Sequence, residues 1–539
     1  MMNGLLLAVR CGRDVRFNKP GWTVPGTAMG TPVISPLTLP DRAQHHFRPM
    51  TSLTGNSFIE RRWALLVLIA LAFRALYAFY HYETSGEKTK IGTFAIVTGD
   101  TDSYLVPVEN YMAHDRYTPD YRMPGVGLPY FVFRQFMDPR TSRDALVIMQ
   151  WLLSGISVYL LALITFRWTG SSRTAMIVYV LFLLSAYSSW YDSSIASDSF
   201  SVTVLIIQVY LFQLALDRQR LWLMVLVGLL MAWLVFLRPV CAALVPVGAF
   251  FVFRYWKGGR VLRTAVLFLL PFAVLDGAWT FRNWRVNHEF NPLTNEGVMP
   301  QYITGGVRYP VETFIQTYGG TLIWWAPGSN MRWFGIWKGG AALDDEGRKA
   351  DPPGAYAYVP AYNKDSLMWI ASNIRMLSSK TMSYDDSTAL ADVVVAKLHR
   401  YSEAYKVGAP FNYQVLSRLR LLWIELDQNG TETILFKPFS EMPLWEKAFK
   451  LFQALLFKFS LIMGIAAILF LRWVPGGEGT VLRRWVPLFA MFTMLIYPLV
   501  FRVPEWRYLV MIFPLLLMMA VIASTHIVRA VRGRMAKAA

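Results

Sequence analysis

Asp100 and Asp102 stand two residues apart in the segment GDTDSY at 99–104, shortly after a long apolar run. A carboxylate in a partly dry site at a membrane edge can accept a proton from a substrate hydroxyl. The same pattern also fits a solvated loop or a helix start, because Asp102 can accept a backbone N–H bond as an N-cap. The segment therefore supplies two candidates for a general base, and Tyr104 is close enough to help shape their site.

A second acidic pair, Asp192 and Asp198, lies in the segment YDSSIASD at 191–198, between two further apolar runs. If the first four runs form one bundle, these carboxylates border the same cleft as Asp102. They would then position a substrate or bind a metal ion, although Asp198 also fits the N-cap of the following helix. The pattern predicts one site built from two distant segments.

Several arginines stand where an apolar run ends. A guanidinium is planar, stays charged and pairs with phosphate oxygens through two hydrogen bonds, so this position suits a lipid phosphate. We expect substrate-binding roles for Arg238, Arg282, Arg507 and Tyr508. Arg74 lies inside the first run, where a charge is costly and tends to face a partner or a cavity. The alternative for each arginine is contact with lipid headgroups or a local ion pair.

The composition indicates that membrane helices hold these residues. The chain of 539 residues is 55% hydrophobic and only 16% charged, whereas soluble domains carry about 25% charged residues. Apolar runs of about 17 to 25 residues are long enough to cross the hydrocarbon core. Ten such runs are predicted as spans, at 62–80, 145–166, 174–190, 199–216, 221–237, 240–256, 262–280, 448–471, 485–501 and 508–528. The sequence therefore predicts an all-α polytopic membrane protein with about ten transmembrane helices.

The basic residues predict the orientation of these spans. Alternate short connections are rich in Lys and Arg, and the positive-inside rule places them and both termini in the cytoplasm. Two long connections then lie outside, with interfacial helices expected at 102–117 and 360–379. The predicted parts are a disordered cytosolic tail or over-extended start at 1–60, a seven-span catalytic module at 61–280 with its first outer loop at 81–144, an extracytoplasmic segment at 281–447, three spans at 448–528 and a basic cytosolic tail at 529–539.

Other classes of function find little support. The net charge of +18 and the pI near 9.8 come from residues spread between apolar runs, which indicates topology signals and anionic lipid, and no nucleic-acid partner. The two cysteines, Cys11 and Cys241, form no disulfide framework, and the histidines do not cluster at metal-ligand spacing. Walker-type loops, GxSxG elbows and dinucleotide fingerprints do not occur, so the sequence predicts no nucleotide chemistry.

The order of these motifs resembles the membrane glycosyltransferases of the GT-C superfamily, in particular the bacterial relatives of protein O-mannosyltransferases and of the lipid A aminoarabinose transferase. The matching residues are Asp102-Ser103-Tyr104, Tyr117, Pro124-Gly125, Asp198, Arg238-Pro239, Arg282-Asn283, Arg507-Tyr508 and Pro514. They cover 62–300 and 485–528. Many relatives carry a lone Asp or Asp-Glu after the first span, whereas here Asp100 precedes Asp102, so either aspartate fits the catalytic position.

The resemblance implies transfer of a hexosyl or pentosyl group from a polyprenyl-phosphate carrier to a hydroxyl of a glycan, lipid or protein, outside the cytoplasm at the plasma membrane. Asp102 would be the base, with Asp100 as the alternative, and the arginines would stabilise the departing phosphate. Some relatives use a divalent metal ion and others use none, so both alternatives stay open. A transporter or flippase of a lipid-linked or anionic substrate is the competing hypothesis, and it predicts charges near mid-membrane. Another membrane enzyme, such as a phosphoethanolamine-type transferase or a polysaccharide polymerase, is a further alternative.

Overall fold

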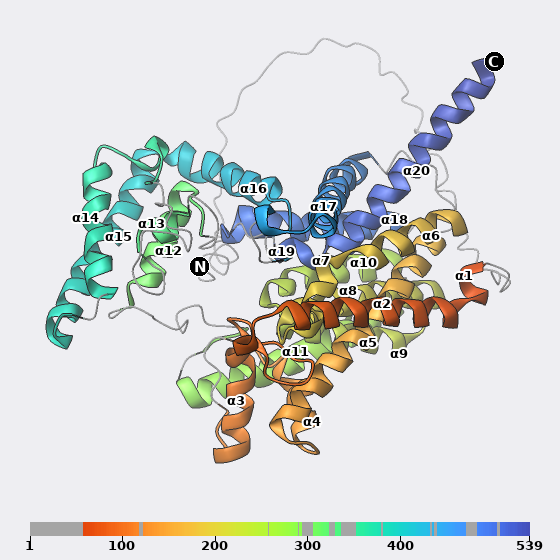
Figure 1. The fold of residues 1–539 in the computed structure, drawn as a ribbon, viewed down its shortest axis with the longest axis horizontal. Coiled ribbons are helices and arrows are strands. Elements are labelled where there is room, and N and C mark those ends of the chain that lie inside the picture. Colours follow the sequence, from red (N-terminus) through yellow and green to blue (C-terminus); the bar gives the residue numbers. More distant parts are fainter. Residues whose placement is uncertain are drawn as a thin grey trace, which may run out of the picture. The chain divides into compact units, whose positions relative to one another are not determined.

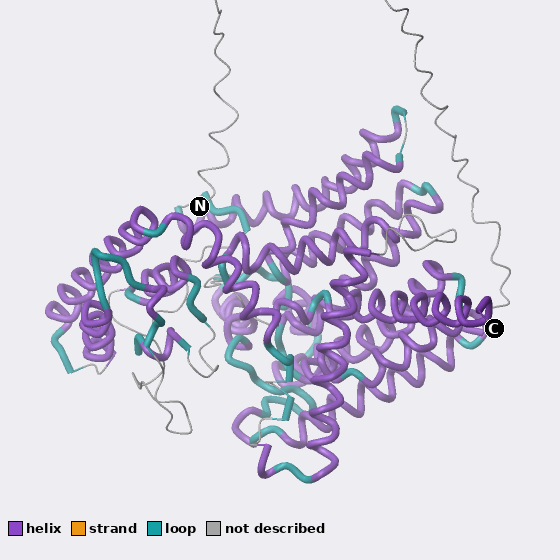
Figure 2. The backbone as a smooth tube through the Cα atoms, turned by 90° about the horizontal axis from the view of Figure 1, so that it is seen from above, coloured by secondary structure: helices purple, strands orange, loops and turns teal. Residues whose placement is uncertain are grey.

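The computed structural model describes residues 58–117, 122–256, 258–288, 290–293, 306–322, 329–335, 352–378, 381–431, 434–435, 439–470, 482–503 and 507–538. These parts of the chain are helices joined by loops (Figure 2). Their only β pairings are isolated bridges, such as the one between Ile96 and Ser194. The predicted all-α fold is confirmed. The predicted tail at 1–60 lies, up to residue 57, outside the described residues.

Eight helical segments of the described chain are long and apolar enough to cross a membrane (Figure 1). They are α2 (Trp63–Thr84), α5 (Pro139–Thr169), the segment Ser172–Ser193, α8 (Ser197–Arg218), α11 (Arg260–Asn287), α17 (Leu444–Phe470), the segment Arg484–Phe501 and α20 (Phe513–Ala538). Two shorter apolar helical segments, α9 (Leu221–Leu237) and Pro239–Tyr255, occupy the fifth and sixth predicted spans. Each predicted run thus coincides with a helical segment, and the protein is a membrane protein.

Local sequence explains where the helices begin and end. Asp138 caps α5, its Oδ1 accepting bonds from the backbone N–H groups of Arg140 and Thr141, and Pro139 occupies the first turn, where its missing N–H costs nothing. The helix ends at Gly170, whose φ of 65° suits a residue without a Cβ. These signals make α5 longer than the predicted run 145–166.

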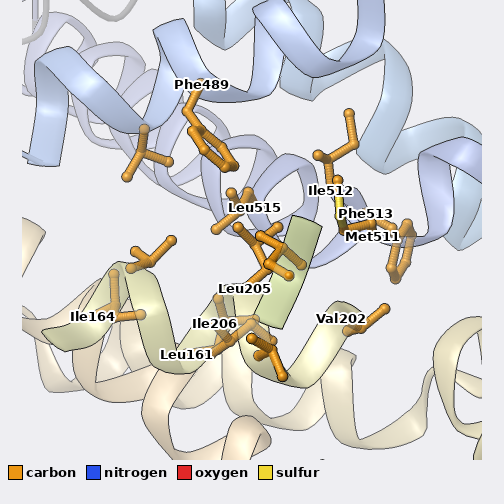
Figure 3. Packing of buried hydrophobic residues seen from close by; sticks show 14 of the residues in the cluster. Leu161, Ile164, Val202, Leu205, Ile206, Phe489, Met511, Ile512, Phe513 and Leu515 are labelled. Atoms are coloured by element: carbon orange, nitrogen blue, oxygen red, sulfur yellow. The ribbon is translucent and has the colours of Figure 1, made fainter. Parts of the chain in front are cut away.

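A continuous hydrophobic core joins the first spans to the last ones. Leu161 and Ile164 of α5 and Leu205 of α8 lie opposite Phe489 and Leu515 of the C-terminal spans (Figure 3). Burial of such side chains stabilises each by about 1.5–3 kcal/mol. This packing brings the end of the chain to the start of α8, where the candidate site lies.

The segment between the seventh and eighth predicted spans has helices and a core of its own. Its helices are α12 (Arg308–Tyr318), α13 (Asn330–Trp333), α14 (Lys364–Ser378), α15 (Tyr384–Gly408), the π-helical turn η9 (Asn412–Leu416) and α16 (Ser417–Asp427). Phe314, Ile370 and Leu398 are buried at its centre. Of the two outer helices expected at 102–117 and 360–379, the first is α3 (Thr101–His114) and the second is α14.

Candidate functional site

Two carboxylates and three guanidinium groups meet at the ends of several helices. Asp100 is the residue before α3, and Asp198 lies in the first turn of α8. Arg122 lies in the loop before α4 (Gly127–Arg134), Arg238 directly follows α9, and Arg507 begins α19 (Arg507–Val510). Helix ends therefore bring together residues that are hundreds of positions apart in the sequence.

Arg507 connects the two carboxylates. Its Nη2 lies 2.9 Å from Oδ2 of Asp198 and 3.3 Å from Oδ2 of Asp100. Arg122 Nη2 lies 2.6 Å from the other oxygen of Asp100, and Arg238 forms an ion pair with the other oxygen of Asp198. The two acidic segments identified in the sequence thus form one cluster. In this cluster Arg507 lies between Asp198 and Asp100.

The two aspartates differ in access to solvent. The side chain of Asp198 is 0% exposed and that of Asp100 is 26% exposed. Burial opposes ionisation of Asp100, but the charges of Arg122 and Arg507 outweigh it and lower the pKa of the carboxyl below its usual value. Asp100 is therefore an ionised group that a substrate can reach, and Asp198 is an internal counter-ion.

Asp102 differs from Asp100 in its position. It is exposed in the first turn of α3, and two helical positions rotate a side chain by about 200°, so it diverges from Asp100. Tyr104 is buried at the cluster, where its hydroxyl donates to Ser197 Oγ (3.2 Å) and its ring centroid lies 5.0 Å from the guanidinium carbon of Arg122. Of the two candidate bases, Asp100 has the surroundings of an active-site group.

Aromatic rings cover the other side of Arg238. Tyr508 stacks on Tyr497 with ring centroids 4.0 Å apart and an interplanar angle of 6°. The guanidinium carbon of Arg238 lies 5.8 Å from the centroid of the Tyr508 ring. These rings exclude water from the buried pair of Arg238 and Asp198, which strengthens its electrostatic attraction.

The Pro-Gly turn supports Arg122, a residue that the sequence interpretation missed. Gly125 lies against the backbone of Phe236, where no Cβ would fit, and its carbonyl accepts a bond from Trp233 Nε1 (2.9 Å). The loop is thereby fixed to the end of α9, beside Arg238. The turn motif was a signal that could have pointed to its neighbour Arg122.

Arg282 has a different set of partners. It donates to the side chain of Asn283 (2.9 Å) and to the carbonyl oxygen of Tyr117, and lies over the rings of Tyr117 and Trp279. Burial raises the pKa of Tyr117 to about 12, although Arg282 counteracts it. These contacts hold the first outer loop on α11, and they are made with residues outside the described carboxylate cluster.

Arg74 and Asp192, predicted to bind substrate, are both buried inside the bundle. Arg74 donates to the carbonyl oxygens of Phe182 (2.9 Å) and Ser185 (3.3 Å), at the point where the third span breaks between α6 (Ser172–Leu184) and α7 (Ala186–Ser189). The end of a helix leaves carbonyl groups without helical donors, and Arg74 supplies them. Asp192 accepts a bond from Ser199. Both side chains are almost fully buried among the helices, and their predicted role in substrate binding stays a prediction.

The carboxylate cluster does not suit a divalent metal ion. The described residues contain no group of three or more His, Cys, Asp or Glu side chains placed to hold one. Asp100 and Asp198 each pair with two guanidinium groups, so a cation between them would meet their positive charge. Hard divalent ions favour several oxygen ligands, and we derive no step through a metal.

The solved structures similar to this chain include the two described next, while neither a family model nor a curated protein matches. One is the archaeal oligosaccharyltransferase AglB from Archaeoglobus fulgidus in complex with an inhibitory peptide and a dolichol-phosphate, with 12% identity, a TM-score of 0.42 and coverage of 89% of this chain and 52% of that one. The chain thus spans about half the length of AglB. The other is ArnT from Cupriavidus metallidurans bound to undecaprenyl phosphate, with 18% identity, a TM-score of 0.33 and coverage of 85% and 77%.

Both similar structures are membrane glycosyltransferases of the GT-C superfamily, which the sequence motifs also resemble. TM-scores this low do not establish a common geometry. The chemistry of the site therefore follows from the contacts of its own residues.

Proposed function

We propose that the protein transfers a sugar from a polyprenyl-phosphate-linked donor to an acceptor hydroxyl on the extracytoplasmic side of the membrane. The observation that carries the proposal is the ionised and partly exposed Asp100, held between the guanidinium groups of Arg122 and Arg507 where apolar helices end. A sugar phosphate on a lipid anchor needs both an apolar path for its tail and a cationic site for its phosphate.

The arginines supply the cationic site. Three guanidinium groups contact the two carboxylates of the described cluster. Arg122 and Arg507 are each 25% exposed, whereas Arg238 is nearly buried against Asp198. Arg122 and Arg507 are therefore the groups that bind the donor phosphate, and they stabilise the charge that grows on it as it leaves.

Asp100 acts as the general base. The acceptor hydroxyl attacks the anomeric carbon, its proton passes to Asp100, and the bond between that carbon and the phosphate oxygen breaks. The sugar is transferred with inversion, and the polyprenyl phosphate is the leaving group. Because donor phosphate competes with Asp100 for the charges of Arg122 and Arg507, its binding raises the lowered pKa of Asp100. The base becomes stronger when the donor is present.

The proposal covers hexosyl and pentosyl donors and glycan, lipid or protein acceptors. It places both termini in the cytoplasm and the cluster on the opposite side, as the positive-inside rule predicts. It is tested by the envelope glycan and lipid profile of cells that lack the protein. A sugar missing from one acceptor supports transfer and identifies both donor and product.

Complementation connects that profile to the site. We expect the wild-type gene and Asp102→Asn to restore the missing sugar, and Asp100→Asn at the same protein level to leave it absent. In liposomes, a transferase moves labelled sugar from the lipid to the acceptor, whereas a flippase moves the intact lipid between leaflets. Lipid movement without cleavage of the sugar bond would overturn the proposal.

A further inference from the structure

An exposed apolar stripe runs along the helical stretch that ends the outer segment. It consists of Phe411, Val415, Leu419 and Trp423, which are 63%, 38%, 52% and 67% exposed. Large apolar side chains at this exposure, four in a row on one element, are unusual on a surface that faces water. The stripe was not among the interfacial segments predicted from the sequence.

The π-helical turn η9 aligns the stripe. In a regular α-helix of 3.6 residues per turn, positions four apart drift by about 40° per step, so four such residues would spread over about 120°. The π turn at Asn412–Leu416 accommodates one extra residue in a turn. The total angular spread of the four side chains then falls from about 120° to about 20°. The four side chains therefore lie on one face, which a regular helix with this sequence would not achieve.

The exposed surface changes character where the stripe begins. On α15 the exposed residues include Asp392, Arg400 and Glu403. From residue 407 to residue 426 no charged residue is exposed. Arg418 and Arg420 in this stretch turn inward and donate to the carbonyl oxygens of Leu499 and Tyr318. The exposed surface from residue 407 to residue 426 is thus uncharged, whereas the exposed surface of α15 carries charged residues that favour contact with water.

The helix that carries the stripe ends against a membrane span. Lys458 in α17 donates from its Nζ to the carbonyl oxygens of Leu426 (3.1 Å) and Asp427 (2.7 Å), which end α16. On either side of Lys458, the exposed residues of α17 include Leu455 and Ile462. A span with such side chains faces hydrocarbon, so the end of α16 touches an element that lies in lipid.

We propose that the helix carrying Phe411, Val415, Leu419 and Trp423 lies in the membrane surface, with these four side chains inserted among the lipid chains. Its partner is the phospholipid bilayer. Apolar side chains on one face and a position beside a span are the properties of an interfacial helix. This role goes beyond the proposed sugar transfer and does not depend on it.

Insertion would fix the outer segment at a set depth beside the candidate site. Arg502 donates to the carbonyl oxygens of Tyr413 (3.0 Å) in the π turn and Gln316 (3.3 Å) in α12. It lies just before Arg507 in the chain, so the same short stretch carries both the contact to the inserted helix and the bridge between the carboxylates. The inserted helix thereby positions the outer segment where a lipid phosphate lies.

Spin-label accessibility tests the insertion. Single cysteines replace Phe411, Leu419 and Trp423, with Asp392 and Arg400 as matched exposed controls on α15. All variants carry Cys11→Ser, so that the added cysteine and the buried Cys241 are the cysteines that remain. The signal from Cys241 is measured in the Cys11→Ser protein without an added cysteine. The protein is placed in phospholipid nanodiscs, one copy per disc. Collisions are measured with oxygen, which concentrates in lipid, and with a water-soluble nickel chelate.

We expect the three stripe labels to collide several-fold more with oxygen and several-fold less with nickel than the two controls. Equal nickel accessibility at stripe and control positions would overturn the proposal. Protection of the stripe labels from both reagents would also overturn it, because another part of the protein would then cover them. The labelled positions are exposed, so the substitutions remove no core contact, and the result does not depend on enzymatic activity.

Discussion

Replacing Asp100 by Asn tests the proposed base most directly. Asn keeps the size and one oxygen acceptor but has no charge and no affinity for a proton at neutral pH. Asp102→Asn is the matched control, because it makes the same chemical change two residues away on an exposed position. A general base contributes about 10²- to 10⁴-fold to the rate, so kcat should fall by that factor in Asp100→Asn alone.

The surroundings of Asp100 predict that folding and donor binding survive. Its partners Arg122 and Arg507 are partly exposed, and such ion pairs contribute about 0–1 kcal/mol to stability. The substitution also removes one negative charge from beside Arg122 and Arg507. Donor binding should therefore stay unchanged or tighten, by up to about tenfold if the removed charge is worth about 1.4 kcal/mol.

Purified protein in liposomes allows the three quantities to be measured separately. Transfer from a lipid-linked sugar gives kcat, binding of undecaprenyl phosphate gives the affinity of the phosphate site, and thermal unfolding gives stability. Loss of kcat with retained binding and folding supports Asp100 as the base. Transfer at the wild-type rate by Asp100→Asn would refute the assignment, and a loss in Asp102→Asn alone would move the base to Asp102.

Four further outcomes are expected. The acid limb of kcat/KM, which reports the protein without donor, should lie below pH about 4, the ordinary range of aspartate, because the pKa of Asp100 is lowered. Arg122→Gln removes a positive charge, raises that pKa and should move the limb to higher pH. Arg507→Ala should weaken binding of undecaprenyl phosphate and slow transfer, each by tenfold or more, in binding and rate assays. The reason is that each lost hydrogen bond to a charged group is worth about 1.5–3 kcal/mol. Arg74→Met should lower the free energy of unfolding by about 1–3 kcal/mol, because two buried carbonyl groups lose their donor, while donor binding by the folded fraction stays unchanged in the same assays. A cysteine at Asp392 should react with an impermeant reagent from the extracytoplasmic side; reaction only from the cytoplasm would contradict the orientation.

The spans were predictable because lipid demands long apolar helices, and the run predicted at 221–237 coincides with α9. The breaks within spans were not predictable. The third span breaks at Ser185, where Arg74 from another span satisfies the freed carbonyl groups, and the ninth ends in the π turn Tyr497–Phe501. Such features depend on contacts between residues far apart in sequence, which apolar periodicity does not encode.

The sequence predicted most of the residues that form the site, but not which of them contact one another. The sequence placed acidic residues and arginines at helix ends, and the structure brings Asp198, Arg238 and Arg507 together. The sequence interpretation favoured Asp102 as the base, whereas we propose Asp100; rotation along a helix gives a physical reason for the two side chains to face different ways. Arg122 was missed because a single arginine in a long loop has no pattern of its own.

The bridge made by Arg507 explains how one cluster can bind a phosphate and activate a base. A guanidinium between two carboxylates holds them together, much as a bound cation would, but it belongs to a side chain that can redirect its donors to a new anion. The buried Asp198 keeps Arg238 as a partner when this happens, so the interior charge stays compensated. Asp100 loses part of its stabilising charge and becomes more basic. In the proposed transfer, redirection of Arg507 toward the donor phosphate both binds the donor and strengthens the base, so that Asp100 would take the acceptor's proton only when a donor is present.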